Sequence, residues 1–119
     1  MSFAISDAVS HVLNSALDGV SLRQNVIADN IANVDTPGFR ASSVDFETSL
    51  RSAIATGDIE TSQTTATEMP TDTPIGANGN NVDLRKETLA AMQSQFQYQM
   101  MSRAVSDRHN LLRASLSSQ

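Results

Sequence analysis

The sequence predicts an all-α fold in its ordered parts, in which long N- and C-terminal helices form an antiparallel, coiled-coil-like pair. A small, irregular or extended central segment is expected between them. Two observations support this fold class. Apolar residues recur at spacings of three and four near both ends of the chain, which is the period of an amphipathic helix. The middle of the chain is rich in Thr and acids, and such segments have little apolar surface to bury.

The N-terminal helix is expected over about residues 6–34. Its apolar positions follow the 3-4 alternation of a coiled-coil seam. They are Val9, Leu13, Ala16, Val20, Ile27, Ile31 and Val34, with one gap at Arg23 and Gln24. Ser6 is a suitable N-terminal cap, and Gly19 is a point where the helix can bend.

A proline sets the end of this helix. Pro37 disfavours helical geometry at Thr36, and Gly38 follows it as a turn residue. We therefore expect the helix to stop at Val34 or Asp35, and the N-terminal unit to span residues 1–37.

The C-terminal unit, residues 82–119, is expected to be a helix from about residue 84 to residue 116, capped by Asp83 or Asn81. Two apolar stripes run along it. The first is Leu89, Met92, Phe96, Met100 and Leu111, interrupted by Asp107, and the second is Tyr98, Met101, Val105, Leu112 and Leu116. One partner helix covers one stripe, so the other points to helices of neighbouring molecules, unless both form one wide face.

The central unit, residues 38–81, differs in composition from both ends. Between residues 57 and 83 there are five acids and no Lys or Arg, so an extended or mobile segment is expected there. The earlier part has apolar residues that can dock on the helices, with a short helix near residues 45–55. These residues are Val44, Phe46, Leu50 and Ile54.

Charge and composition exclude several classes of protein. The chain has 119 residues, a net charge of −5 and scattered Lys and Arg, which argues against a nucleic-acid surface and against an anionic membrane. It has no Cys, which excludes disulfides and thiol chemistry. No apolar run approaches the ~20 residues of a membrane span, and we expect no cleavable signal peptide.

Catalytic chemistry has no candidate residues. His11 and His109 are isolated from other metal ligands in the sequence, so solvated or structural roles are expected. Asp45 and Glu47 are two residues apart, a spacing that does not share a helix face. We expect no enzyme, no metal and no cofactor.

Two segments resemble flagellar rod and hook proteins. The first reads Asn30-Ile31-Ala32-Asn33-Val34-Asp35-Thr36-Pro37-Gly38-Phe39, and the second reads Gly79-Asn80-Asn81-Val82-Asp83-Leu84, with Glu87 and Tyr98-Gln99 downstream. The first is similar to the N-terminal motif of the whole axial family. The second is similar to the FlgB type of basal-body rod subunit.

This resemblance implies a structural subunit of the proximal rod, in the periplasmic part of the basal body. It implies export through the type III export gate and torque transmission from the membrane ring to the distal rod. The implied partners are copies of the chain, rod subunits of the FlgC and FlgF types, the adaptor FliE and the MS-ring. The element Phe46 to Leu50 resembles a segment associated with export, although an i,i+4 apolar pair also arises from local core packing.

The residues of the motif have physical roles of their own. Asn30 and Asn33 lie on one face of the helix and can fix the register of a helix interface, as a buried Asn does in coiled coils. C-terminal capping explains Asn33 equally well and Asn30 poorly. Thr36-Pro37-Gly38 sets a rigid exit from the helix.

We expect folding to depend on assembly, because the helical seams are incomplete in one copy. The isolated chain should then be largely disordered at its ends. The alternatives are a subunit of the FlgC type and a cytosolic helical adaptor or secretion chaperone. A small hydrolase would need convergent polar residues, and the sequence shows none.

Overall fold

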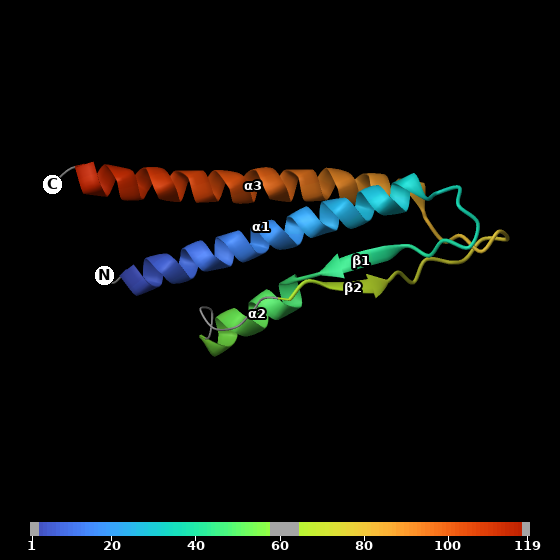
Figure 1. Ribbon diagram of the computed structural model, residues 1–119, viewed down its shortest axis with the longest axis horizontal. Coiled ribbons are helices and arrows are strands. Elements are labelled where there is room, and N and C mark those ends of the chain that lie inside the picture. Colours follow the sequence, from blue (N-terminus) through green and yellow to red (C-terminus); the bar gives the residue numbers. More distant parts are fainter. Residues whose placement is uncertain (1–2, 58–64, 118–119) are drawn as a thin grey trace.

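The computed structural model describes residues 3–57 and 65–117. Its elements, in chain order, are α1 (Phe3–Ala32), β1 (Ser42–Asp45), α2 (Glu47–Thr56), β2 (Thr67–Pro70) and α3 (Leu84–Ser117). The two long terminal helices run antiparallel (Figure 1), which confirms the expected fold class. The molecule is a flat rod whose Cα atoms extend over 66 × 27 × 14 Å.

Helix α1 lies between two partners. On one side it packs against α3, and on the other it carries the two-stranded sheet and α2 (Figure 1). The buried core lies on this second side, where Ala16, Val20 and Val26 of α1 meet Val44 and Phe46. In the described part of the chain, no helix has the length and hydrophobicity of a membrane span.

The ends of α1 differ from the expected ones. The helix begins at Phe3, so Ser6 lies inside it and cannot be its N-terminal cap. It ends at Ala32, two residues before Val34. Beyond Ala32 the backbone tightens, because the Val34 N–H donates to Ile31 O (3.2 Å), and such three-residue bonds are common in the last turn of a helix.

The central segment is more ordered than its composition indicates. The short helix expected near residues 45–55 corresponds to α2, and β1 and β2 form an antiparallel pair in which Ser42 faces Pro70 and Asp45 faces Thr67. The expected extended backbone is present at residues 67–70, but it is paired in a sheet that the sequence analysis did not predict. Residues 58–64 of that expectation lie outside the described residues. A Thr-rich run suits a strand because β-branched side chains favour extended backbone.

Helix α2 begins with a side-chain cap from the end of β1. The Asp45 carboxylate accepts hydrogen bonds from the Thr48 N–H (3.1 Å) and the Thr48 hydroxyl (2.7 Å). These bonds, led by that of the hydroxyl, lower the pKa of the Asp45 carboxyl below its ordinary value, since they favour the charged form. At the other end, Gly57 adopts the left-handed conformation (φ 73°) that ends many helices.

Packing explains why residue 19, inside helix α1, is a glycine. It is buried against the ring of Phe46, and a Cβ atom placed on it would lie 2.3 Å from Phe46 Cγ. A glycine in a helix costs about 1 kcal/mol relative to alanine. Here the missing side chain lets the aromatic ring that starts α2 lie directly on the backbone of α1.

We expect Gly19→Ala to destabilise the docking of the central segment, although alanine is the better helix former. Overfilling a packed site costs about 1–3 kcal/mol, which exceeds the gain in helix propensity. Chemical unfolding followed by circular dichroism measures the change. Ser21→Ala on the exposed face of α1 is the control, and Phe46→Leu should restore part of the loss in Gly19→Ala. Equal stability of Gly19→Ala and the parent chain would contradict this packing.

Candidate functional site: the motif clasp and the outer stripe of α3

The two motif segments meet at the end of the molecule that lies away from both termini (Figure 1). Asn80 is 8% exposed, and its side-chain Nδ2 donates to the carbonyl oxygens of Asn33 and Thr36, at 2.8 Å each. Its Oδ1 accepts the Val82 N–H (2.7 Å). These carbonyls follow the end of α1 and also accept the backbone N–H groups of Thr36 (3.0 Å) and Phe39 (3.2 Å). Asn80 therefore adds a second donor to each carbonyl and ties the exit of α1 to a segment 44 or more residues away.

Asn81 ties the same region to the start of β1. Its Oδ1 accepts the N–H of Ala41 (2.6 Å), and its own N–H donates to the carbonyl of Phe39 (3.3 Å). Its Nδ2 donates to the carbonyl of Thr73 (3.4 Å). We call the side chains of Asn30, Asn33, Asn80 and Asn81, with their bonded backbone groups, the motif clasp.

Two glycines allow the motif segments to approach each other. Gly38 and Gly79 have φ angles of 76° and 81°, a region that L side chains rarely adopt. The Gly38 N–H donates to the carbonyl of Asn78 (3.0 Å). A Cβ atom on Gly79 would lie 3.2 Å from Gly38 Cα, whereas a Cβ atom on Gly38 would meet no atom within 4 Å. The close approach therefore favours glycine at position 79, and the positive φ angle favours it at position 38.

The Asn30 side chain hydrogen-bonds to strand β1 and not to a second helix. It is 1% exposed, its Nδ2 donates to Ser42 O (2.7 Å), and its Oδ1 accepts the Ser42 N–H (3.2 Å). The hypothesis that Asn30 fixes the register of a helix interface is therefore wrong. β1 runs beside α1 and, among the described residues, pairs with β2 on one edge only, so the amide of Asn30 bonds to the backbone on its other edge. Asn33 has the local role expected of a cap, because its Nδ2 donates to Asp29 O (2.8 Å).

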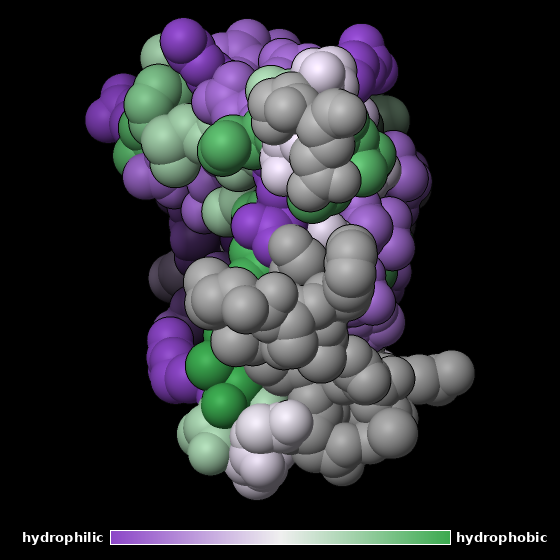
Figure 2. All heavy atoms as spheres, turned by 90° about the vertical axis from the view of Figure 1, so that its left-hand side faces the viewer, coloured by the Kyte–Doolittle hydropathy of each residue, from purple (hydrophilic) through white to green (hydrophobic). Residues whose placement is uncertain are grey.

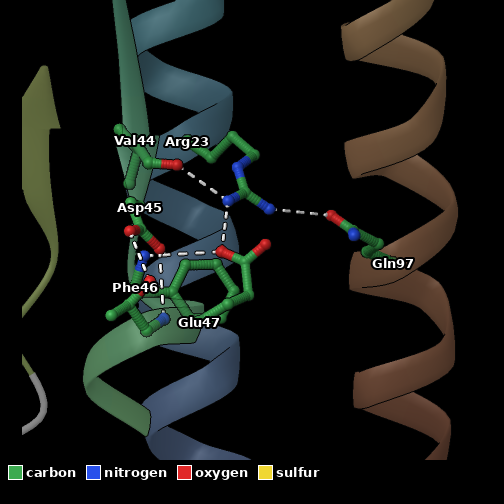
Figure 3. A network of polar contacts seen from close by, with 7 residues as sticks. Arg23, Val44, Asp45, Phe46, Glu47 and Gln97 are labelled. Carbon is green, nitrogen blue, oxygen red and sulfur yellow. Dashed lines mark hydrogen bonds and ion pairs between the residues drawn. The ribbon is translucent and has the colours of Figure 1, made fainter. Parts of the chain in front are cut away.

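Arg23 of α1 connects this helix to β1, α2 and α3 (Figure 3). This role was not predicted from the sequence. Its guanidinium donates to Val44 O (2.8 Å) and to Gln97 Oε1 of α3 (3.2 Å), and forms an ion pair with Glu47 of α2. It also lies over the ring of Phe46, 4.8 Å from the centroid, within the range of a cation–π contact. The only hint of this role was the gap that Arg23 makes in the apolar seam.

The apolar residues of the two helices have different surroundings. On α1, Ala16, Val20 and Ile27 are buried, Leu13, Ile31 and Val34 are half-buried, and Val9 is exposed. The seam of α1 is thus largely used inside the subunit. On α3, the second stripe turns toward α1 at Met101 and Val105, which are half-buried, whereas Tyr98, Leu112 and Leu116 are exposed.

The first stripe of α3 remains uncovered in the subunit. We call it the outer stripe, and its members are Leu89, Met92, Phe96, Met100 and Leu111, with 48–72% of each residue exposed. Hydrophobic side chains also reach the surface on both flanks of α3 at the upper end of the view in Figure 2. Scattered apolar residues are ordinary on a protein surface, but a continuous row marks a contact with another molecule.

The element Phe46 to Leu50 is part of the core. Phe46 is 5% exposed and Leu50 packs against the same cluster. The Phe46 side chain is accessible only in a chain whose central segment has not docked, whereas Leu50 is half-buried in the folded subunit.

The residues considered for catalysis do not converge. His11 and His109 are exposed, and among the described residues no three His, Cys, Asp or Glu side chains form a group that could hold a metal ion. Asp45 and Glu47 are engaged in the cap of α2 and the ion pair with Arg23.

Known proteins with the same motifs are flagellar. The family model of the flagella basal body rod protein matches residues 11–40. The FlgB rod protein of Bacillus subtilis is 35% identical to this chain over 115 residues, which cover 87% of this chain and 89% of the relative. The chain belongs to the FlgB-type flagellar basal body rod proteins.

Two further FlgB-type proteins are similar to this chain over most of its length. The protein of Borreliella burgdorferi is 35% identical over 72% of this chain and 78% of its own length. The protein of Escherichia coli is 32% identical over 84% of this chain and 86% of its own length. As a basal-body rod protein, the chain is a structural component of the flagellar basal body and not an enzyme.

We expect Asn80→Asp to weaken the motif clasp. The substitution replaces the two Nδ2 hydrogen bonds by a carboxylate oxygen facing two carbonyl oxygens, and a buried group left without its partner costs about 1–3 kcal/mol. Chemical unfolding would measure this loss. Asn78→Asp is a matched control, because the Asn78 side chain accepts the Asn80 N–H through its oxygen, and a carboxylate keeps that bond. Equal effects of the two substitutions would contradict the role of Asn80.

Proposed function

We propose that this chain is a subunit of the proximal rod, in the periplasmic part of the basal body, and that it transmits torque from the membrane ring toward the distal rod. The observation that supports this proposal best is the outer stripe, because a lone subunit leaves it in water. Its partners are then copies of the chain and other axial components, namely rod subunits of the FlgC and FlgF types, the adaptor FliE and the MS-ring.

Export as an unfolded chain through the type III export gate belongs to the same proposal. Once the central segment docks on α1, Phe46 is buried and Leu50 is half-buried. An export element made of these side chains is therefore accessible before folding and largely covered after it.

Folding is coupled to assembly in this proposal. Helices α1 and α3 lie closest where α1 ends and α3 begins, and they diverge toward the termini (Figure 1). A cavity of about 110 Å³ lies between the diverging halves, lined by Leu13, Val105 and Leu112 among others. Poor contact of this kind gives little protection against local unfolding.

In dilute solution, we expect the diverging halves to be disordered while the core around Phe46 persists. Amide hydrogen exchange should be fast before Leu13 and after Val105, and slower from Ala16 to Asn30. Circular dichroism should show less helix than the two full-length helices require. A monomer that is fully helical, protected throughout and heat-resistant would contradict folding on assembly.

We expect Phe96→Glu to block incorporation into the rod without unfolding the subunit. Phe96 is 61% exposed in the subunit, so glutamate is tolerated there, but a neighbour that covers it would bury an unpaired charge. Quantifying the protein in purified basal bodies should show at least a tenfold loss, together with loss of swimming. Phe96→Leu, which keeps an apolar side chain at the same position of the outer stripe, should leave both unchanged. Normal swimming with Phe96→Glu would contradict the role of the outer stripe.

A further inference from the structure

A shallow groove runs between α1 and α3 on a different side of α3 from the outer stripe. Its volume is about 250 Å³. It is lined by Gln24, Ile27, Ala28 and Ile31 of α1 and by Ala91, Ser94 and Gln95 of α3. Ala28, Ala91 and Ser94 are small, so the floor of the groove can accept large side chains from another molecule.

The outer stripe supplies side chains of that kind. Phe96 follows the groove residue Ser94 by two positions, which is about 200° around the helix. Met92 and Phe96 therefore point away from the groove of their own subunit. One subunit cannot place its outer stripe in its own groove, so the groove and the stripe remain available to two different neighbours.

The exposed charges of the two helices are opposite in sign. In the described part of α1 every exposed ionised residue is an aspartate, namely Asp7, Asp18 and Asp29. Helix α3 exposes four cations, Arg85, Lys86, Arg103 and Arg113, against one acid, Asp107. Surfaces with complementary charge favour one orientation of docking and suppress others.

The charges of each helix lie along one side of that helix. Asp18 and Asp29 are eleven residues apart, which is about three helical turns, so they share one side of α1. Asp29 follows the groove residue Ala28 by one position, about 100° around the helix, so the aspartates flank the groove and do not line it. Arg85 and Arg103 are eighteen residues apart, which is about five turns, and both lie on the same side of α3 as Met92 and Phe96.

We propose that the outer stripe of one copy packs into the groove between α1 and α3 of a second copy, with the cations of α3 beside the aspartates of α1. This inference rests on the proposed rod function and names the faces that meet. The contact uses two different surfaces, and contacts of this heterologous type extend into open filaments unless the rotation closes a ring. A stripe-to-stripe contact would instead be self-complementary and would stop at a dimer.

Disulfide cross-linking in basal bodies tests this arrangement, and the parent chain has no cysteine. The variant Ala28→Cys with Phe96→Cys is expressed in flagellated cells, and purified basal bodies are oxidised. Both positions are exposed in the subunit. Disulfides form only when the two Cα atoms come within about 7 Å, and Phe96 points away from α1 of its own chain. We expect a ladder of dimers, trimers and larger multiples.

The single variants and a mismatched pair provide the controls. Ala28→Cys alone, Phe96→Cys alone, and Phe96→Cys with Ser43→Cys on the exposed side of β1 should remain monomeric. Dimers from Phe96→Cys alone, or monomers only from the Ala28→Cys and Phe96→Cys pair, would overturn the proposed contact. Both results leave the rod function standing, whereas absence of the parent chain from basal bodies would overturn the rod function itself.

Charge exchange gives an independent readout. Asp18→Arg with Asp29→Arg, and separately Arg85→Asp with Arg103→Asp, should each lower incorporation into basal bodies at least fivefold. All four substitutions in one chain should restore it to within twofold of the parent, because the two faces again carry opposite charges. Failure of the combined variant to recover, while each pair is defective, would overturn the charge pairing.

Discussion

Helix α1 is the element on which all the others are placed. The sheet and α2 pack on one side of it, and α3 packs on the other. The contact of Phe46 with Gly19 sets how closely the central segment can approach α1. Arg23 then joins that segment to α3 through bonds to Val44 O and Gln97. A change on α1 therefore affects both neighbours, and α1 is the main partner of α3.

Side-chain amides hold the backbone at three points around α1 and the start of β1. Asn30 offers a donor and an acceptor to Ser42, as a neighbouring strand would. Asn80 adds a second donor to each of two carbonyls that follow the end of α1 and already accept backbone N–H groups. Asn81 accepts the N–H of Ala41. An amide suits these positions because it has donors and acceptors in one plane, whereas a carboxylate lacks the donor.

The sequence predicted those features that depend on local pattern. The apolar period located both long helices, and Asp83 was expected as a cap of α3, where its carboxylate accepts the N–H groups of Arg85 and Lys86 (3.1 and 3.2 Å). The sheet was missed because a Thr-rich strand resembles a disordered segment in composition. The partners of Asn80 and Asn81 lie 40 or more residues away, and helical spacing contains no information on such contacts.

The distribution of side-chain size on α3 is the reverse of that in a helix that folds alone. Near the start of α3 the residues at the contact with α1 are small, and Ser94 there is 1% exposed, which lets the two helices approach closely. The large side chains, such as Met92 and Phe96, point outward. Burying a large apolar side chain contributes about 1.5–3 kcal/mol, so most of the apolar stabilisation that α3 can offer is unused in a single subunit. That stabilisation would be gained when another molecule covers the helix, so the proposed assembly into the rod would also complete the fold.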